Sequence, residues 1–102
     1  MKTNPEKWQR ALQIASVNEG VDVERILGKS RLEHIAVARH LARWIAVECM
    51  DLSVRFVEQV SKANYTTITW SIRRINELRD IHPMIKNTTE QIKKSIANEN
   101  RV

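Results

Sequence analysis

The sequence predicts an all-α domain, a bundle of about five to six helices. Apolar residues recur at helical spacings of three and four, and no segment alternates convincingly as a half-buried strand does. Only two Gly and two Pro occur in the 102 residues, so helix breakers are rare. This length suits a single domain spanning residues 1–102, with its core over about 8–97 and a frayed end over 98–102.

The first two helices are predicted by residues typical of helix ends. Asn4 suits an N-cap, Pro5 suits the first helical position, and Gly20 supplies a left-handed end after Glu19. The buried face of this helix carries Trp8, Ala11, Leu12 and Ala15. A short helix over Val23 to Leu27 is expected to follow, capped by Asp22.

A long helix is expected next, up to about Met50. Ser30 and Glu33 have the spacing of a capping box, in which each residue bonds a free N–H of the first turn. The buried stripe of the helix is Ile35, Ala38, Ala42, Ile45 and Cys49. Basic residues lie on or near one flank, and such clusters usually form a solvated face: Arg39, His40 and Arg43.

The pattern that follows is typical of a helix-turn-helix. Ser53 can cap a short helix over Val54 to Val60, and residues 61–63 form a turn. Asn64 can then cap a longer helix, whose apolar face carries Ile68, Ile72, Ile75 and Leu78. Its first turn is rich in hydroxyls, which suits a helix that contacts base edges. On pattern alone, an ordinary helical hairpin in a bundle fits equally well.

The last helix is expected over Met84 to Ala97. Pro83 disfavours helix in the residue before it, so the preceding helix should end near Asp80 to His82. Apolar and small polar residues then recur at helical spacing: Ile85, Thr88, Thr89, Ile92 and Ile96.

Charge and composition indicate the class of partner. Lys and Arg number 17 against 12 Asp and Glu, a formal charge of +5 that suggests nucleic acid or another polyanion. The single Cys49 cannot form an internal disulfide, which fits a reducing compartment. The N-terminus lacks the apolar core of a signal peptide, and no apolar run is long enough to span a bilayer. We therefore expect a cytoplasmic protein without a membrane partner.

The sequence carries no recognisable pattern for catalysis or for a cofactor. Gly28-Lys29-Ser30 resembles the end of a P-loop, but Val23 stands where that motif requires glycine, so no nucleotide site is expected. His34, His40 and His82 do not share a helix face at ligand spacing, so no metal site is expected. We expect a protein that is not an enzyme and needs no cofactor.

Several segments together resemble the C-terminal DNA-binding domain, domain IV, of the bacterial replication initiator DnaA. Val21 to Leu27 looks like the short helix before that family's basic loop, and Lys29-Ser30-Arg31 lies where the loop is. Ile35 to Ala42 is similar to the V-A-R-P-R-Q-x-A stretch of the family, and Asn64 to Ile68 stands where its signature reads D-H-T-T-V. The resemblance covers about residues 8–97, nearly the whole chain.

The resemblance implies DNA contacts at specific positions. Arg31 would enter the minor groove. The major groove would be addressed by Asn64, Tyr65, Thr66 and Thr67. Phosphates would be met by Lys29 in the basic loop, Arg39 and His40. From the residues alone we add two phosphate contacts, Lys62 in the turn and Arg73 further along the helix.

The departures from the family bear on the expected function. Asn64 and Tyr65 replace the family's Asp and His, His40 replaces its Gln, and Ser61-Lys62 replaces its Gly-Gly turn. A changed set of reading residues implies a changed or relaxed DNA sequence. Glu33 and Val37 also stand where the family often has Arg.

We expect sequence-specific binding to double-stranded DNA by a stand-alone protein that regulates transcription or replication by occupying its site. The chain lacks the family's ATPase module, so it is not expected to act as a complete initiator. One alternative is a helical protein-interaction module that has lost base reading and docks through Trp8, Trp44 or Trp70. Another is weak, sequence-independent DNA binding by charge alone.

Overall fold

The computed structural model describes residues 3–99, and this part of the chain is all-α, as the sequence predicts. It contains six α-helices and one π-helical segment, η1, which continues α3. In chain order they are α1 (Pro5–Glu19), α2 (Val23–Leu27), α3 (Glu33–Trp44), η1 (Ile45–Cys49), α4 (Val54–Ser61), α5 (Tyr65–Ile81) and α6 (Pro83–Glu99).

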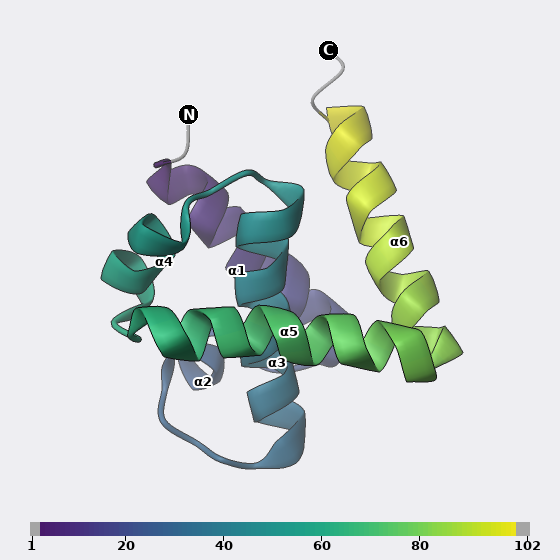
Figure 1. Cartoon of the computed structure of the whole chain (residues 1–102), viewed down its shortest axis with the longest axis horizontal. Helices are drawn as coiled ribbons and strands as arrows, with labels where there is room; N and C mark the ends of the chain where they lie inside the picture. Colours follow the sequence, from purple (N-terminus) through teal and green to yellow (C-terminus); the bar gives the residue numbers. More distant parts are fainter. Residues whose placement is uncertain (1–2, 100–102) are drawn as a thin grey trace.

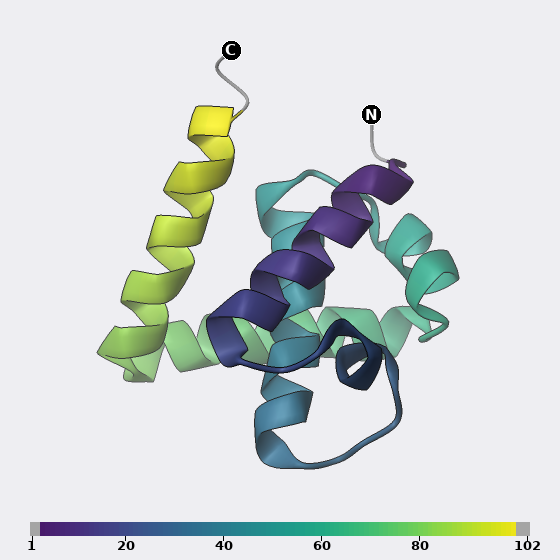
Figure 2. The same ribbon diagram turned by 180° about the vertical axis from the view of Figure 1, so that it is seen from behind.

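The helix α3 is the centre of the arrangement. It packs against α5 on one side and α1 on the other. Figure 1 shows α5 lying across the front of α3, and Figure 2 shows α1 crossing the back. The helix α6 turns away from the end of α5 and packs against α5 and η1 (Figure 1). The start of α5 lies at the opposite end of that helix from α6, beside α4, where the helix-turn-helix is formed.

The core is built around Trp44, which is 1% exposed. Its indole Nε1 donates a hydrogen bond to Asn76 Oδ1 at 2.9 Å. The guanidinium of Arg79 lies over the indole ring, 5.3 Å from the ring centroid. Because Trp44 comes from α3 and both partners come from α5, these contacts fix how the two helices cross.

The helix ends that the sequence predicts from capping residues are mostly confirmed. Asn4 accepts from the backbone N–H groups of Glu6 and Lys7, and Gly20 ends α1 with a φ of 66°. Ser53 caps α4, and Asn64 caps α5. The expected break at Pro83 is present as well, since α5 ends at Ile81 and α6 begins at Pro83 itself. Within residues 3–99, no helix has the length and apolar character needed to cross a membrane.

Three expectations about helix ends need correction. The capping box is wrong, because α3 begins at Glu33 and Ser30 Oγ accepts from the Leu32 N–H instead. Asp22 occupies the N-cap position of α2, but its carboxylate makes no capping hydrogen bond. At the other end, α6 continues through Glu99, and the remainder of the segment expected to fray, residues 100–102, lies outside the described residues.

Candidate nucleic-acid interface

The turn of the helix-turn-helix depends on a left-handed residue. Lys62 ends α4 with φ 57° and ψ 30°, a conformation that favours glycine and costs other residues energy. The turn is short, because α5 begins at Tyr65, directly after its N-cap Asn64. The Lys62 side chain is exposed at the turn.

The first turn of α5 faces outward. Asn64 Oδ1 accepts from the Thr67 N–H at 2.8 Å, so the amide of Asn64 is used as the helix cap. Ile68 is fully buried and fixes the rotation of the helix. Since Ile68 points into the core, the four residues before it are left exposed: Asn64, Tyr65, Thr66 and Thr67.

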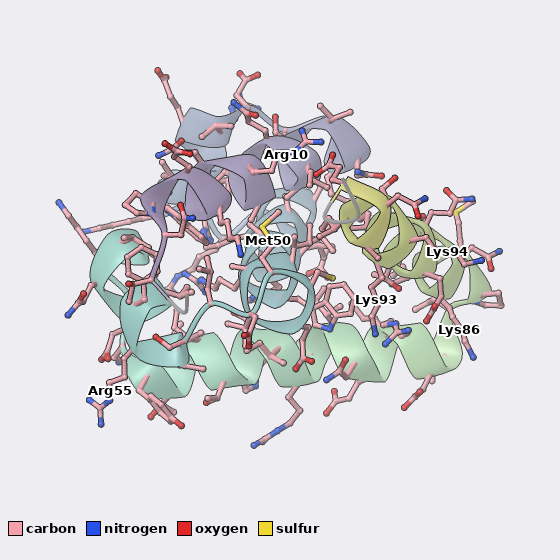
Figure 3. All side chains as sticks on the ribbon, turned by 90° about the horizontal axis from the view of Figure 1, so that it is seen from above. Arg10, Met50, Arg55, Lys86, Lys93 and Lys94 are labelled. Carbon is pink, nitrogen blue, oxygen red and sulfur yellow. The ribbon has the colours of Figure 1, made fainter. Side chains whose placement is uncertain are left out.

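Tyr65 lies outside the core and is contacted by two residues of α4. The guanidinium of Arg55 lies over the Tyr65 ring, 5.7 Å from its centroid. The Tyr65 N–H donates to the Glu58 carboxylate at 3.1 Å. The side chain remains 48% exposed. Figure 3 shows Arg55 pointing outward beside the start of α5, so the pair Arg55–Tyr65 forms part of the exposed end of the helix-turn-helix.

Arg39 holds the loop between α2 and α3. Its guanidinium donates to the backbone carbonyls of Ile26 at 2.7 Å, Ser30 at 3.0 Å and Arg25 at 3.3 Å. Burial lowers the pKa of Arg39 from its ordinary value. Lys29 and Arg31 are exposed on this loop, which bows away from the body of the protein (Figure 1). Arg39 therefore fixes the position of the loop that carries Arg31.

Arg43 is buried, which contradicts the expectation of a solvated basic face. It is 7% exposed, and its Nη1 donates to Ser71 Oγ on α5 at 2.9 Å. Within residues 3–99, its Nε has no hydrogen-bond partner. Burial and the neighbouring Arg39 lower the pKa of Arg43 to about 10, so it remains charged at neutral pH.

His40 shares the Ser71 hydroxyl with Arg43. Its Nδ1 lies 2.8 Å from Ser71 Oγ, and its ring meets the Trp70 indole edge-on at 4.9 Å between centroids. Burial, followed by the charges of Arg43, Arg39 and Arg74, lowers the pKa of His40 to about 4. His40 is therefore neutral at pH 7. Ser71 Oγ accepts from Arg43 and also bonds Nδ1 of His40, as acceptor or as donor according to the tautomer of the imidazole.

A depression of about 430 Å³ lies between the α2–α3 loop and the helix-turn-helix. Half of the site residues predicted from the sequence line it: Lys29, Arg39, His40, Lys62 and Thr67. The others lie outside its lining, and all of them are exposed: Arg31, Asn64, Tyr65, Thr66 and Arg73. The fold therefore brings segments that are more than 30 residues apart in the sequence to one surface.

The sequence reasoning missed Arg43, Arg55 and Trp70 as parts of this surface. Trp70 is 49% exposed and lines the depression, whereas Trp44 is in the core. Arg55 carried a usable signal, because it lies on α4, the first helix of the motif, and in helix-turn-helix proteins the first helix crosses the DNA backbone. The burial of Arg43 had no such signal.

Comparisons with known proteins agree with the resemblance stated above. No protein-family model matches the chain. It is 33% identical over 66 residues to the chromosomal replication initiator protein DnaA of Pseudothermotoga lettingae, covering 65% of this chain and 15% of that protein. It is 33% identical over 82 residues to the protein of the same name from Picosynechococcus sp., and this match covers 79% of this chain and 18% of that protein. The chain thus spans less than a quarter of these relatives, and it resembles a C-terminal DnaA-like region.

Proposed function

We propose, from the similarity of this chain to the C-terminal region of DnaA, that it binds double-stranded DNA in a sequence-specific manner. The observation that carries the proposal is the exposed first turn of α5, which stands beside a depression lined with cations. A helix of this kind can enter the major groove with its N-terminal residues against the bases. The cations on either side would then meet the two phosphate strands.

In this proposal the bases are read by exposed side chains of the first turn of α5. Thr66 and Thr67 offer hydroxyls and also methyl groups that can contact the methyl of thymine. Tyr65 offers a phenol that donates or accepts, and Arg55 over its ring limits the directions in which the phenol can point. Arg55 itself is placed to meet a phosphate, since the first helix of the motif crosses the backbone.

The loop before α3 supplies a second contact. Arg31 is exposed on it, and the hydrogen bonds of Arg39 hold the loop against α2 and α3. An arginine fixed beside a major-groove helix can enter the adjacent minor groove, which attracts cations. This arrangement supports Arg31 as a base-reading residue whose position depends on Arg39.

The phosphate contacts in the proposal differ in kind. Lys29, Lys62 and Arg73 are exposed cations, and each neutralised phosphate would contribute about −0.9 to the slope of log K against log salt. His40 is neutral at pH 7, so it would donate to a phosphate only in the tautomer that carries its hydrogen on Nε2. The biological role we infer is occupation of a duplex site in the control of replication or transcription.

Binding selection from random duplexes tests the proposal. An enriched motif is expected, and Thr66→Ala should lose about 1–3 kcal/mol on the selected site and much less on scrambled DNA. Thr88→Ala is the matched control, because it makes the same change on α6, away from the helix-turn-helix. If folded protein enriches no motif and binds no duplex, the proposal fails and the protein-interaction module is favoured. Of the three tryptophans, only Trp70 is exposed enough to dock a partner.

A further inference from the structure

The depression beside the helix-turn-helix has an unusual balance of charge. Four cationic residues line it: Lys29, Arg39, Arg43 and Lys62. Among the described residues of its lining there is no Asp or Glu. The ion pairs found within residues 3–99 join Arg10 to Glu99, Arg74 to Glu77 and Arg79 to Glu90, so none neutralises a cation of the depression. The site is therefore strongly electropositive.

Arg43 is the innermost of these cations. Burying an arginine costs free energy unless its charge is paired and its N–H groups are bonded. Arg79 meets this requirement, since it bonds the Thr89 hydroxyl and pairs with Glu90. Arg43 is buried with one neutral partner, Ser71, and with an unpartnered Nε among the described residues. Within residues 3–99 no carboxylate pairs with Arg43, so an anion in the depression would neutralise its charge, although the buried Nε itself would stay out of reach of that anion.

The rest of the lining is apolar and partly aromatic. Trp8, Leu12 and Ile26 are core residues that reach the depression from the inside. Leu27 and Trp70 are each 49% exposed and stand at its wall. Sites for small molecules have volumes of about 300–1,000 Å³ and combine apolar walls with a few polar groups. The depression, at about 430 Å³, has that size and that composition.

We propose that the depression is a binding site for a small aromatic phosphate monoester. The phosphate would lie toward Arg43 with Lys29 and Lys62 at the rim, and the ring would lie against Leu27 and Trp70. A monoester is favoured over a carboxylate because it carries about −1.5 to −2 charges at pH 7, which suits a site with several unpaired cations.

Such a ligand would also regulate DNA binding. Lys29, Lys62 and Thr67 line the depression and belong to the surface proposed to meet DNA. An occupant would neutralise two of the cations and cover that edge of the surface, so it would weaken DNA binding. Only this regulatory consequence rests on the proposed function, since the site itself can be tested without DNA.

Calorimetry on the intact chain with phenyl phosphate tests the site. Inorganic phosphate and phenol separate the contributions of charge and ring, and dimethyl phosphate, a monoanionic diester, represents the DNA backbone. Phenyl phosphate should bind at least about tenfold more tightly than each of the three. Arg43→Met should weaken binding about tenfold or more, because it removes charged donors while keeping much of the volume. Lys94→Met, on α6, removes the same charge at an exposed position away from the depression (Figure 3) and should change nothing.

The outcomes decide the proposal in either direction. No heat with phenyl phosphate at millimolar concentration, or equal binding by Arg43→Met, would overturn it. Equal affinity for dimethyl phosphate would overturn the monoester and leave a site for the DNA backbone alone. If Arg43→Met does not fold, Lys62→Met at the exposed turn replaces it and should weaken binding about threefold or more. In a DNA titration, phenyl phosphate should compete with the duplex for wild type but not for Arg43→Met. If the wild-type protein binds phenyl phosphate but binds no duplex at all, only the proposed function is refuted.

Discussion

Replacing Arg39 distinguishes a residue that holds a loop from one that contacts a phosphate. The resemblance to the DnaA family implies a phosphate contact, whereas in the structure the guanidinium donates to three backbone carbonyls. Arg39→Ala removes both possible roles. Arg39→Lys keeps the charge but loses the planar fork that reaches several acceptors at once. The two substitutions together therefore separate the roles.

The expected loss of stability follows from the geometry. The bonds to Ile26 and Ser30 are 2.7 and 3.0 Å long, whereas the bond to Arg25 is 3.3 Å and exposed. Hydrogen bonds with a charged partner contribute about 1.5–3 kcal/mol each, and partial exposure lowers this value. We expect Arg39→Ala to lower the free energy of unfolding by about 2–3 kcal/mol, which corresponds to a fall in Tm of roughly 10–20 °C for a domain of this size.

Thermal melting followed by circular dichroism gives the stability, and hydrogen exchange of the amides of residues 28–32 gives the order of the loop. Arg39→Lys should lose most of the stability that Arg39→Ala loses, and both should speed exchange in the loop. If Arg39→Lys keeps the Tm and the protection of the loop, while Arg39→Ala only lowers the salt slope by about 0.9, then Arg39 is a phosphate contact and our assignment is wrong.

Three further predictions concern the turn and the buried network. Lys62→Gly should raise stability by up to about 1 kcal/mol, because glycine adopts the left-handed conformation more easily, and should lower the salt slope of DNA binding by about 0.9. The pKa of His40 is lowered from 6.5 to about 4, so the unfolded chain takes up the proton first as pH falls. Stability should therefore decline from pH 6.5 toward 4, by less than about 1.4 kcal/mol per pH unit because solvent screens the half-buried imidazole, and urea midpoints of His40→Gln should show less decline. Ser71→Ala leaves Arg43 and His40 without their shared hydroxyl and should lower stability by about 1–3 kcal/mol, measured by urea denaturation. An unchanged midpoint would mean that water replaces the hydroxyl.

The sequence was most informative where structure is determined locally. A helix cap needs only one side chain and the N–H groups two or three residues later, so Asn4, Ser53 and Asn64 were identified from their neighbours alone. The same local reasoning failed at Ser30, where the spacing to Glu33 matched a capping box. There Arg39, one to two turns into α3, bonds the Ser30 carbonyl and holds the segment in the loop. A contact between distant residues therefore overrode a local preference.

The burial of Arg43 could not be predicted from the sequence, because it also depends on a contact between distant residues. Helical periodicity places it four residues after Arg39, on a flank that a single helix would expose. It is covered because α5 crosses α3 at this point, with Ser71 as the residue that faces it. No pattern within either helix predicts which small residue of the other will lie opposite. The most distinctive charge of the depression is thus a property of the crossing and not of either helix.

The cap of α5 restricts how Asn64 can read DNA. Asparagine distinguishes adenine by a bidentate pair, in which its oxygen accepts from N6 and its nitrogen donates to N7. That pair needs the whole amide edge to face the base. Here Oδ1 accepts from the Thr67 N–H at 2.8 Å, which leaves the nitrogen and one lone pair of the oxygen for a base. Under the proposed function, the cap thus restricts the orientations in which Asn64 can form the bidentate pair. Discrimination between bases would then rest more on Tyr65, Thr66 and Thr67, whose side chains are not needed to begin the helix.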